Sequence, residues 1–132
     1  MTVALRGDPP GEPARPIARG ELIGVHGGMS QVVTVDWVVD TGAEITVVRQ
    51  SVMVQLAWEM DAAGVVGHGT TGDDPIAIGH GPDLVLDGRF RPYPWLGVKE
   101  DDEGGDLLGV DTLARLGLTV VWDAASGSGW LL

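Results

Sequence analysis

The chain has 132 residues, which suits one domain and is short for two. Its 19 acidic and 8 basic residues give a formal charge of -11, which argues against nucleic acids and anionic membranes as partners because both attract basic surfaces. There is no Cys, so disulfides and thiolate metal sites are excluded, and no apolar run reaches the roughly 18 residues that a membrane-spanning helix needs. We therefore expect a soluble, cytoplasmic protein without metal or cofactor.

The first part of the chain predicts strands joined by an irregular connector. Residues 2–6 form a short apolar run, and residues 6–16 are rich in Pro and Gly and cannot be regular structure. Residues 17–25 predict a weak strand. Residues 32–39 alternate clearly but are largely apolar on both faces, which predicts a strand that is buried on both sides.

A carboxylate then stands on a tight turn between two apolar, β-branched runs. The turn is Asp40-Thr41-Gly42-Ala43, followed by Glu44, and residues 45–48 resume as a strand. Gly at the third position allows close approach of another backbone and favours a turn with positive φ. Asp and Gly also favour ordinary turns, so this pattern needs support from its context.

The middle of the chain predicts one helix and a polar hairpin. Ser51 can cap a helix over residues 51–60, which Gly64 would end. The apolar runs at residues 65–66 and 76–78 enclose a stretch of Gly, Thr and Asp that has the composition of a hairpin tip.

The last part of the chain predicts short strands and a second helix. Asp87-Gly88 is a strong hairpin signal. Strands are expected at residues 83–86, 89–91, 95–98, 118–122 and 130–132, and a helix closed by Gly117 at residues 111–116, after Leu107-Leu108-Gly109.

Three segments in this order resemble the retropepsin-type aspartic peptidases, the single-domain family that includes the retroviral proteases and related cellular ones. The segments are residues 38–44, the Gly-rich residues 67–79 at the position of the family's flap, and residues 107–113 with an apolar-apolar-Gly motif before a short helix. The resemblance covers roughly residues 17–123. It implies an all-β fold with one or two short helices: an acid-protease barrel, one lobe per chain, active as a two-fold homodimer.

The resemblance also implies the chemistry. Two carboxylates about 3 Å apart share one proton, so that one activates a water while the other protonates the substrate carbonyl oxygen. One chain supplies only Asp40, so a second copy has to supply the other. The implied catalytic residues are Asp40, Thr41 and Gly42. The implied contacts to an extended polypeptide substrate are Gly42, Ala43, Glu44, Thr70, Thr71, Gly72 and Asp73, with no metal and no cofactor.

The chain departs from the family pattern at one position. Val110 stands where retroviral members usually carry an Arg that pairs with the acid after the turn, so Glu44 lacks that partner. Leu108 and Leu113 are expected in the core, and Gly109 is expected to let two segments pack closely behind the turn.

We expect one domain over residues 1–132, with residues 1–16 and 124–132 flanking a core at residues 17–123. The apolar residues 2–6 and 130–132 are candidates for interleaving at the dimer interface. Trp130 is a candidate anchor there, and an ordinary core Trp is an equally good reading of it. The rival hypotheses are a non-catalytic module of the same fold that dimerises or binds peptides, and a protease restricted to one partner protein.

Overall fold

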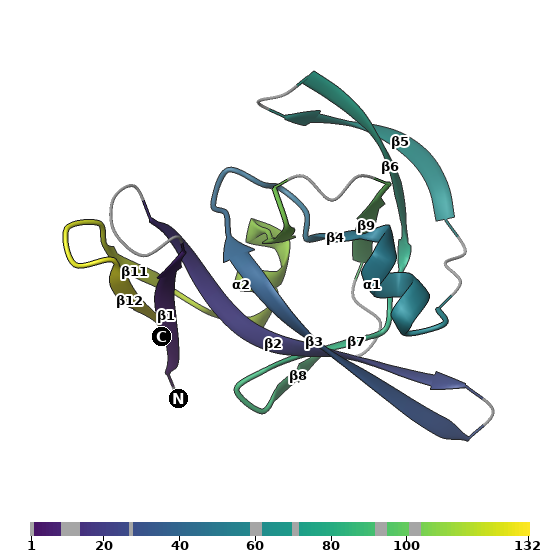
Figure 1. The fold of residues 1–132 in the computed structure, drawn as a ribbon, viewed down its shortest axis with the longest axis horizontal. Helices are drawn as coiled ribbons and strands as arrows, with labels where there is room; N and C mark the ends of the chain where they lie inside the picture. Colours follow the sequence, from purple (N-terminus) through teal and green to yellow (C-terminus); the bar gives the residue numbers. More distant parts are fainter. Residues whose placement is uncertain are drawn as a thin grey trace.

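The computed structural model describes residues 2–8, 14–26, 28–58, 62–69, 72–91, 95–100 and 104–132 (Figure 1). The strands are β1 (Val3–Asp8), β2 (Arg15–His26), β3 (Met29–Val39), β4 (Val47–Arg49), β5 (Ala62–Gly69), β6 (Gly72–His80), β7 (Asp83–Leu86), β8 (Arg89–Arg91), β9 (Trp95–Lys99), β10 (Asp106–Leu108), β11 (Val120–Asp123) and β12 (Ser128–Leu131). The helices are α1 (Gln50–Gln55) and α2 (Val110–Leu116). The expected all-β class with two short helices is confirmed.

The described strands form one open, hydrogen-bonded sheet. Its order is β11-β12-β1-β2-β3-β10-β4-β9-β6-β5, and β7 pairs with both β2 and β8 off this path. Most neighbours are antiparallel, but β10 runs parallel to β3, with Leu108 opposite Val39, and β4 runs parallel to β9. The first of these parallel pairs brings the ends of β3 and β10 to the same edge of the sheet.

The core lies against β3 and the strands around it. Trp37 is completely buried, and so are Leu108 and several other aliphatic side chains, while Leu113 of α2 is 5% exposed. These Leu residues are core, as predicted. The expectation that β3 is buried on both faces holds only for its last three residues, because Val32 and Thr34 near its start are exposed. The outer half of β3 instead runs with β2 in a ribbon that projects from the molecule (Figure 1).

Helix α1 is shorter than the sequence predicts. It ends at Gln55 because Ala57 adopts a left-handed φ of 51°, and the N–H of Trp58 donates to the Met53 carbonyl at 3.1 Å. This closure is typical of helix ends that usually carry Gly. Gly64, the expected helix end, lies inside β5 instead.

Two other local predictions are confirmed. Helix α2 ends at Gly117, which has a φ of 65° and donates its N–H to the Ala114 carbonyl. Asp87 and Gly88 join β7 to β8 with φ values of 47° and 73°. Positive φ at both central residues is the requirement of the type I′ turn that matches the twist of the flanking strands.

The two terminal strands pair with each other within one chain. Strand β12 lies between β11 and β1, with Trp130 opposite both Ala4 and Val121. Both edges of β12 are therefore already hydrogen-bonded. Neither helix among the described residues has the length or apolar character to cross a membrane.

Candidate active site

Asp40 is the first residue after β3 and its carboxylate is held by the turn that follows. Its backbone N–H donates to the Leu108 carbonyl at 3.1 Å, which anchors the loop to the end of β10. The Ala43 N–H donates to the Asp40 carbonyl at 3.1 Å, and the Gly42 N–H donates to the Asp40 Oδ1 at 2.9 Å. The Oδ1 of the half-buried carboxylate is thus held by the turn, while its Oδ2 has no hydrogen bond with a described residue.

Gly42 does not have the positive φ expected for it. Its requirement is one of space, since a Cβ there would lie 3.2 Å from the Asp40 Oδ1. Ala43 is partly buried, whereas Thr41 and Gly42 are exposed on the outside of the turn. The Thr41 hydroxyl makes no hydrogen bond to a described residue, so it is available to another molecule.

The segment between β10 and α2 holds the other side of the turn. The N–H of Val110 donates to the Ala43 carbonyl at 2.8 Å, and the N–H of Asp111 donates to the Glu44 carbonyl at 3.3 Å. Residues 108–111 therefore bond to the backbone at both ends of residues 40–44. Two of the three segments in the resemblance are brought together by these contacts.

Thr46 connects the same two segments through its side chain. Its buried Oγ1 lies 2.6 Å from the Thr112 Oγ1 and 3.0 Å from the Asp111 Oδ1, and it accepts from the Gly109 N–H at 3.1 Å. A hydroxyl has one proton and two lone pairs. Because Asp111 as a carboxylate only accepts, Thr46 donates to Asp111 and accepts from Thr112 and Gly109, which uses its full capacity.

Gly109 is confirmed as a close-packing position. A Cβ there would lie 2.4 Å from the carbonyl carbon and 2.5 Å from the carbonyl oxygen of Ile45. Its φ of -87° is ordinary, so the requirement for Gly is purely steric. The backbone of the turn and the backbone before α2 are in direct contact, as predicted.

Glu44 has no ionic partner at position 110, where the family pattern has Arg and this chain has Val. Both residues are exposed, Val110 at 43%, and Glu44 forms no ion pair with a described residue. A partly buried ion pair lies nearby: the buried Asp106 at the start of β10 accepts from the Arg49 guanidinium at 3.1 Å and from the Arg49 N–H at 2.8 Å. Sequence reasoning missed this pair because its members are 57 residues apart.

The predicted flap is a β-hairpin made of β5 and β6. Gly69 pairs with Gly72, and the predicted substrate-contact residues Thr70 and Thr71 lie outside the described residues. Gly72 and Asp73 begin β6. The expected tip at residues 67–75 is therefore mostly strand. In Figure 1 the hairpin arches at the top of the molecule, where the chain between β3 and β4 also projects.

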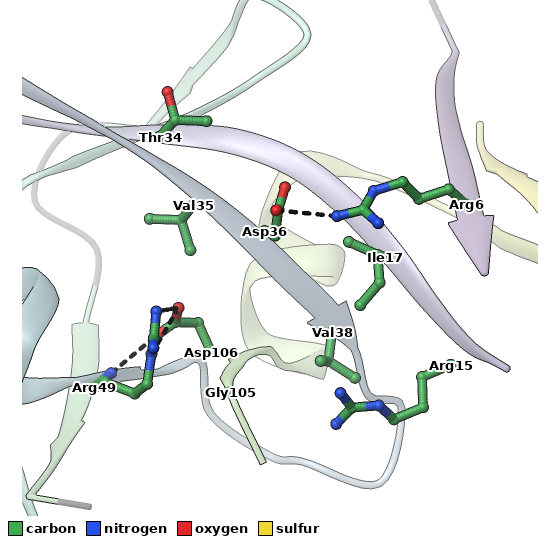
Figure 2. Close-up of a pocket in the computed structure, with 10 residues that line it drawn as sticks. All are labelled: Arg6, Arg15, Ile17, Thr34, Val35, Asp36, Val38, Arg49, Gly105 and Asp106. Carbon is green, nitrogen blue, oxygen red and sulfur yellow. Dashed lines mark hydrogen bonds and ion pairs between the residues drawn. The ribbon is translucent and has the colours of Figure 1, made fainter. Parts of the chain in front are cut away.

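A polar pocket of about 260 Å³ is lined by residues of β1, β2, β3, β4 and β10 (Figure 2). It is lined by Arg6, Arg15, Ile17, Thr34, Val35, Asp36, Val38, Arg49, Gly105 and Asp106. None of these residues was expected to form a site. A signal was available in the alternation of Thr34, Asp36 and Val38, which places polar groups on the face of β3 opposite to Trp37.

The described residues contain no cluster of three metal-ligating side chains. No protein-family model matches the chain, and none of the curated proteins matches it.

Proposed function

We propose that the chain is a retropepsin-type aspartic endopeptidase that works as a two-fold homodimer. The observation that supports this most is the bonding of the Asp40 turn to residues 108–111. An ordinary strand-end turn needs no second segment, whereas this one is fixed from both sides by partners about 65 residues away. That arrangement fixes the direction of a partly exposed carboxylate.

The mechanism needs a second carboxylate, and the described part of one chain offers none beside Asp40. A two-fold axis next to the turn would bring Asp40 of both copies together, because an isologous contact repeats the same residue on each side. One carboxyl keeps a proton because two like charges that close cannot both ionise. The ionised group then takes a proton from the attacking water, and the protonated group donates to the carbonyl oxygen of the peptide.

The free Thr41 hydroxyl and the close approach at Gly42 suit this arrangement. The exposed Thr41 hydroxyl has no partner among the described residues, which suits a contact across the two-fold axis, and the exposed Gly42 suits contact with an extended peptide. Such a peptide would bind between the turn and the β5–β6 hairpin by strand addition. The sheet would close over it as the expected acid-protease barrel.

The dimer contact is proposed at β11. Strand β12 is paired on both edges, with β1 and β11, and residues 3–5 of β1 pair only with β12 among the described strands. Strand β11 is the end of the sheet, and Val121 and its register partner Trp130 are 45% and 49% exposed. Two copies with a charge of -11 each repel one another, so an uncharged apolar contact is the most favourable place for them to meet.

The direct test of catalysis is Asp40→Asn. The substitution keeps the size of the side chain but removes the shared proton, so cleavage of a peptide library should fall by a factor of about 1,000 or more. Asp87→Asn, the same change in an exposed hairpin turn, is the control and should cleave normally. Cleavage of the peptides by the Asp40→Asn variant at the wild-type rate would contradict the mechanism. A folded, dimeric wild type that binds peptides and cuts none would favour the non-catalytic module.

The test of the interface compares two exposed Val residues. Val121→Ser should shift the monomer–dimer equilibrium toward monomer by about tenfold, measured by sedimentation, and should lower activity at micromolar concentration. Val25→Ser, at a residue that is 56% exposed on the β2–β3 ribbon, should leave association unchanged. Equal effects of the two changes would move the interface elsewhere.

A further inference from the structure

The outer half of β3 has an edge with which no described strand pairs. Residues 29–36 pair with β2 on one side, whereas β10, the next strand on the other side, pairs only with residues 37–39. Met29 and Val32 are 74% and 57% exposed, and the two residues between them are exposed as well. In Figure 1 this part of the ribbon projects at the lower right, far from β11 at the left. An open strand edge is a template for pairing with another strand.

The bond at Asp40 identifies the backbone groups that this edge presents. The Asp40 N–H donates to the Leu108 carbonyl, so it points to the β10 side of the strand. The N–H and C=O groups of successive residues in a strand point alternately to its two sides. By this alternation residues 30, 32 and 34 direct their backbone groups to the open edge, while residues 29, 31 and 33 direct theirs to β2.

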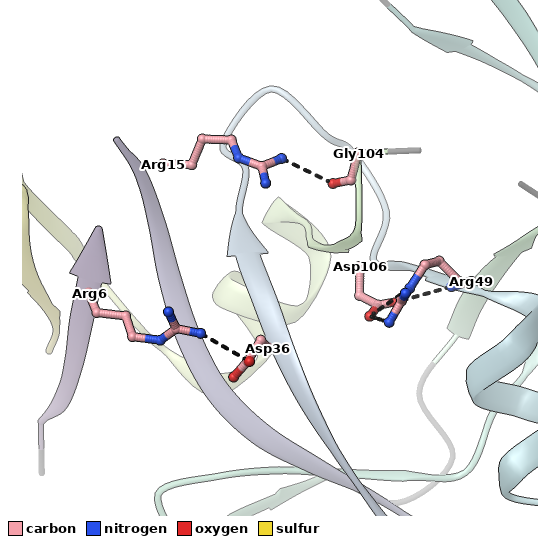
Figure 3. Close-up of polar contacts among 6 residues, drawn as sticks. All are labelled: Arg6, Arg15, Asp36, Arg49, Gly104 and Asp106. Atoms are coloured by element: carbon pink, nitrogen blue, oxygen red, sulfur yellow. Dashed lines mark hydrogen bonds and ion pairs between the residues drawn. The ribbon is translucent and has the colours of Figure 1, made fainter. Parts of the chain in front are cut away.

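The open edge is uncharged, although the chain carries -11. Residues 29–35 contain no acidic or basic residue, and they contain neither Lys nor Pro, which commonly keep open edges from pairing. The next residue, Asp36, is already paired: its Oδ2 lies 3.0 Å from the Arg6 Nη2 (Figure 3), and its Oδ1 lies 3.3 Å from the Arg19 Nε. Two copies can therefore approach along this edge without bringing like charges together.

The edge is also complementary to itself. A two-fold axis that passes through the sheet at Val32 places this residue opposite its own copy, with residue 30 opposite residue 34. Residues of one face then meet the same face, as an antiparallel pairing requires. The outward backbone groups of residues 30, 32 and 34 meet in pairs and form about six hydrogen bonds. In this register Asp36 lies opposite Gly28 and not opposite another carboxylate.

The same register gives the contact an apolar row. Ile23 is the partner of Val32 in the β2–β3 ladder, so these two residues and their copies form one row across the axis. Cross-strand pairs of β-branched side chains stabilise a sheet. Val25 is on the same face and is 56% exposed, but it lies on β2, about 5 Å farther from the axis. The row therefore includes Val32 at its centre and leaves Val25 outside.

We propose that residues 30–34 of β3 pair with the same residues of a second copy, so that two ribbons form one four-stranded antiparallel sheet. This contact is separate from the proposed one at β11. It places the two Asp40 residues on the order of 50 Å apart, too far to share a proton. A chain with two different isologous contacts assembles beyond the dimer. The paired segment is short, so this association is weak and depends on concentration.

Disulfide cross-linking tests the contact directly, because the chain has no Cys of its own. Val32→Cys places two thiols across the axis, where the Cα atoms are about 5.5 Å apart and within disulfide range. Val25→Cys is the matched control, since the two Val residues are 57% and 56% exposed on the same face. With oxidised glutathione at equal protein concentration, Val32→Cys should form the linked dimer at least about tenfold faster. Both variants should keep the wild-type melting temperature because both sites are exposed.

A charge exchange tests the two-fold register without a covalent bond. In the Val121→Ser background, which weakens the proposed β11 contact, Val32→Lys and Val32→Glu each place like charges across the axis. A mixture of the two should associate about fivefold more tightly than either protein alone, as measured by sedimentation. Val25→Lys mixed with Val25→Glu should show a smaller gain. In the wild type, amide exchange of residues 30, 32 and 34 should slow as the protein concentration rises, and that of residues 29, 31 and 33 should not.

Equal cross-linking rates at positions 32 and 25, or equal gains in the two mixtures, would overturn the pairing. Protection of residues 30, 32 and 34 by an unrelated extended peptide, without cross-linking at position 32, would assign the edge to another polypeptide and would also overturn it. Neither result touches the proposed protease, which depends on Asp40 and β11. Selective cross-linking at position 32 in a protein that cuts no peptide would support the pairing and reject the protease.

Discussion

The turn at Asp40 and the β5–β6 hairpin are the two halves of the proposed active site, and they are held in opposite ways. Five backbone and side-chain hydrogen bonds tie residues 40–46 to residues 108–111. In the hairpin, only residues 76–80 of β6 pair with β9. Residues 66–69 and 72–75 pair only with each other.

The turn is therefore fixed by the rest of the chain, whereas the outer part of the hairpin is held only by its own two strands. A carboxylate that shares a proton with a partner must be placed to within a fraction of an ångström, and the dense bonding of the turn serves that purpose. A two-stranded ribbon without a further strand is marginally stable in water. Such a ribbon suits a part that has to move when a peptide enters and leaves.

The largest expected effect comes from Gly109. Gly109→Ala places a Cβ 2.4 Å from the Ile45 backbone, so the two segments have to separate, and we expect a loss of about 3 kcal/mol in the free energy of unfolding. Urea denaturation measures it. Gly42→Ala is the matched control, because its Cβ meets only one carboxylate oxygen at 3.2 Å, and it should cost less than about 1 kcal/mol. Similar losses at the two positions would show that the turn can adjust.

A smaller loss is expected from Thr46→Val. The change preserves shape but removes the hydroxyl, leaving the Gly109 N–H without its acceptor and the Thr112 hydroxyl without its partner in a buried place. Unfolding experiments should show a loss of about 2 kcal/mol. Thr41→Val removes an exposed hydroxyl that has no described partner and should change stability by less than about 0.5 kcal/mol. The reverse order would contradict the role of Thr46 as the connector of the two segments.

The smallest free energy is expected for opening the outer part of the hairpin. Amide hydrogen exchange should report about 2 kcal/mol or less for residues 65–69 and 72–74, since their only ladder is internal. The amides of Asp40 and Val110, which bond to the Leu108 and Ala43 carbonyls, should exchange at least about 100-fold more slowly. Equal protection in both regions would remove the distinction between a fixed and a movable half.

Much of the fold was predictable where the local chemistry is decisive. The Asp87-Gly88 turn and the Gly117 helix end carry residues that tolerate positive φ, and both form as expected. The end of α1 was not predicted, because Ala57 adopts a positive φ there and the sequence has no Gly at that position to indicate a helix end. The sequence predicts hairpin strands that are too short, because polar and Gly residues can pair in a β-ladder through their backbone groups alone.

The site was predictable only in part. The turn residues and Gly109 follow from the motif, and the contact between them follows from the resemblance. The Arg49–Asp106 ion pair and the arginines around the pocket come from segments far apart in the chain, and no local pattern links them. Long-range pairs of this kind depend on strand order, which residue spacing alone does not give.

The position of β12 has a consequence for how the molecule is made. The second half of β1 pairs with the nearby β2, but Val3 has its partner at Leu131, more than a hundred residues away along the chain. Closing so large a loop is slow, and contacts of this range form late in folding. We expect β11 to be set in its final place only when β12 has joined it to β1. Association of two copies through β11, as proposed above, would then follow the pairing of β12 with β1 and not precede it.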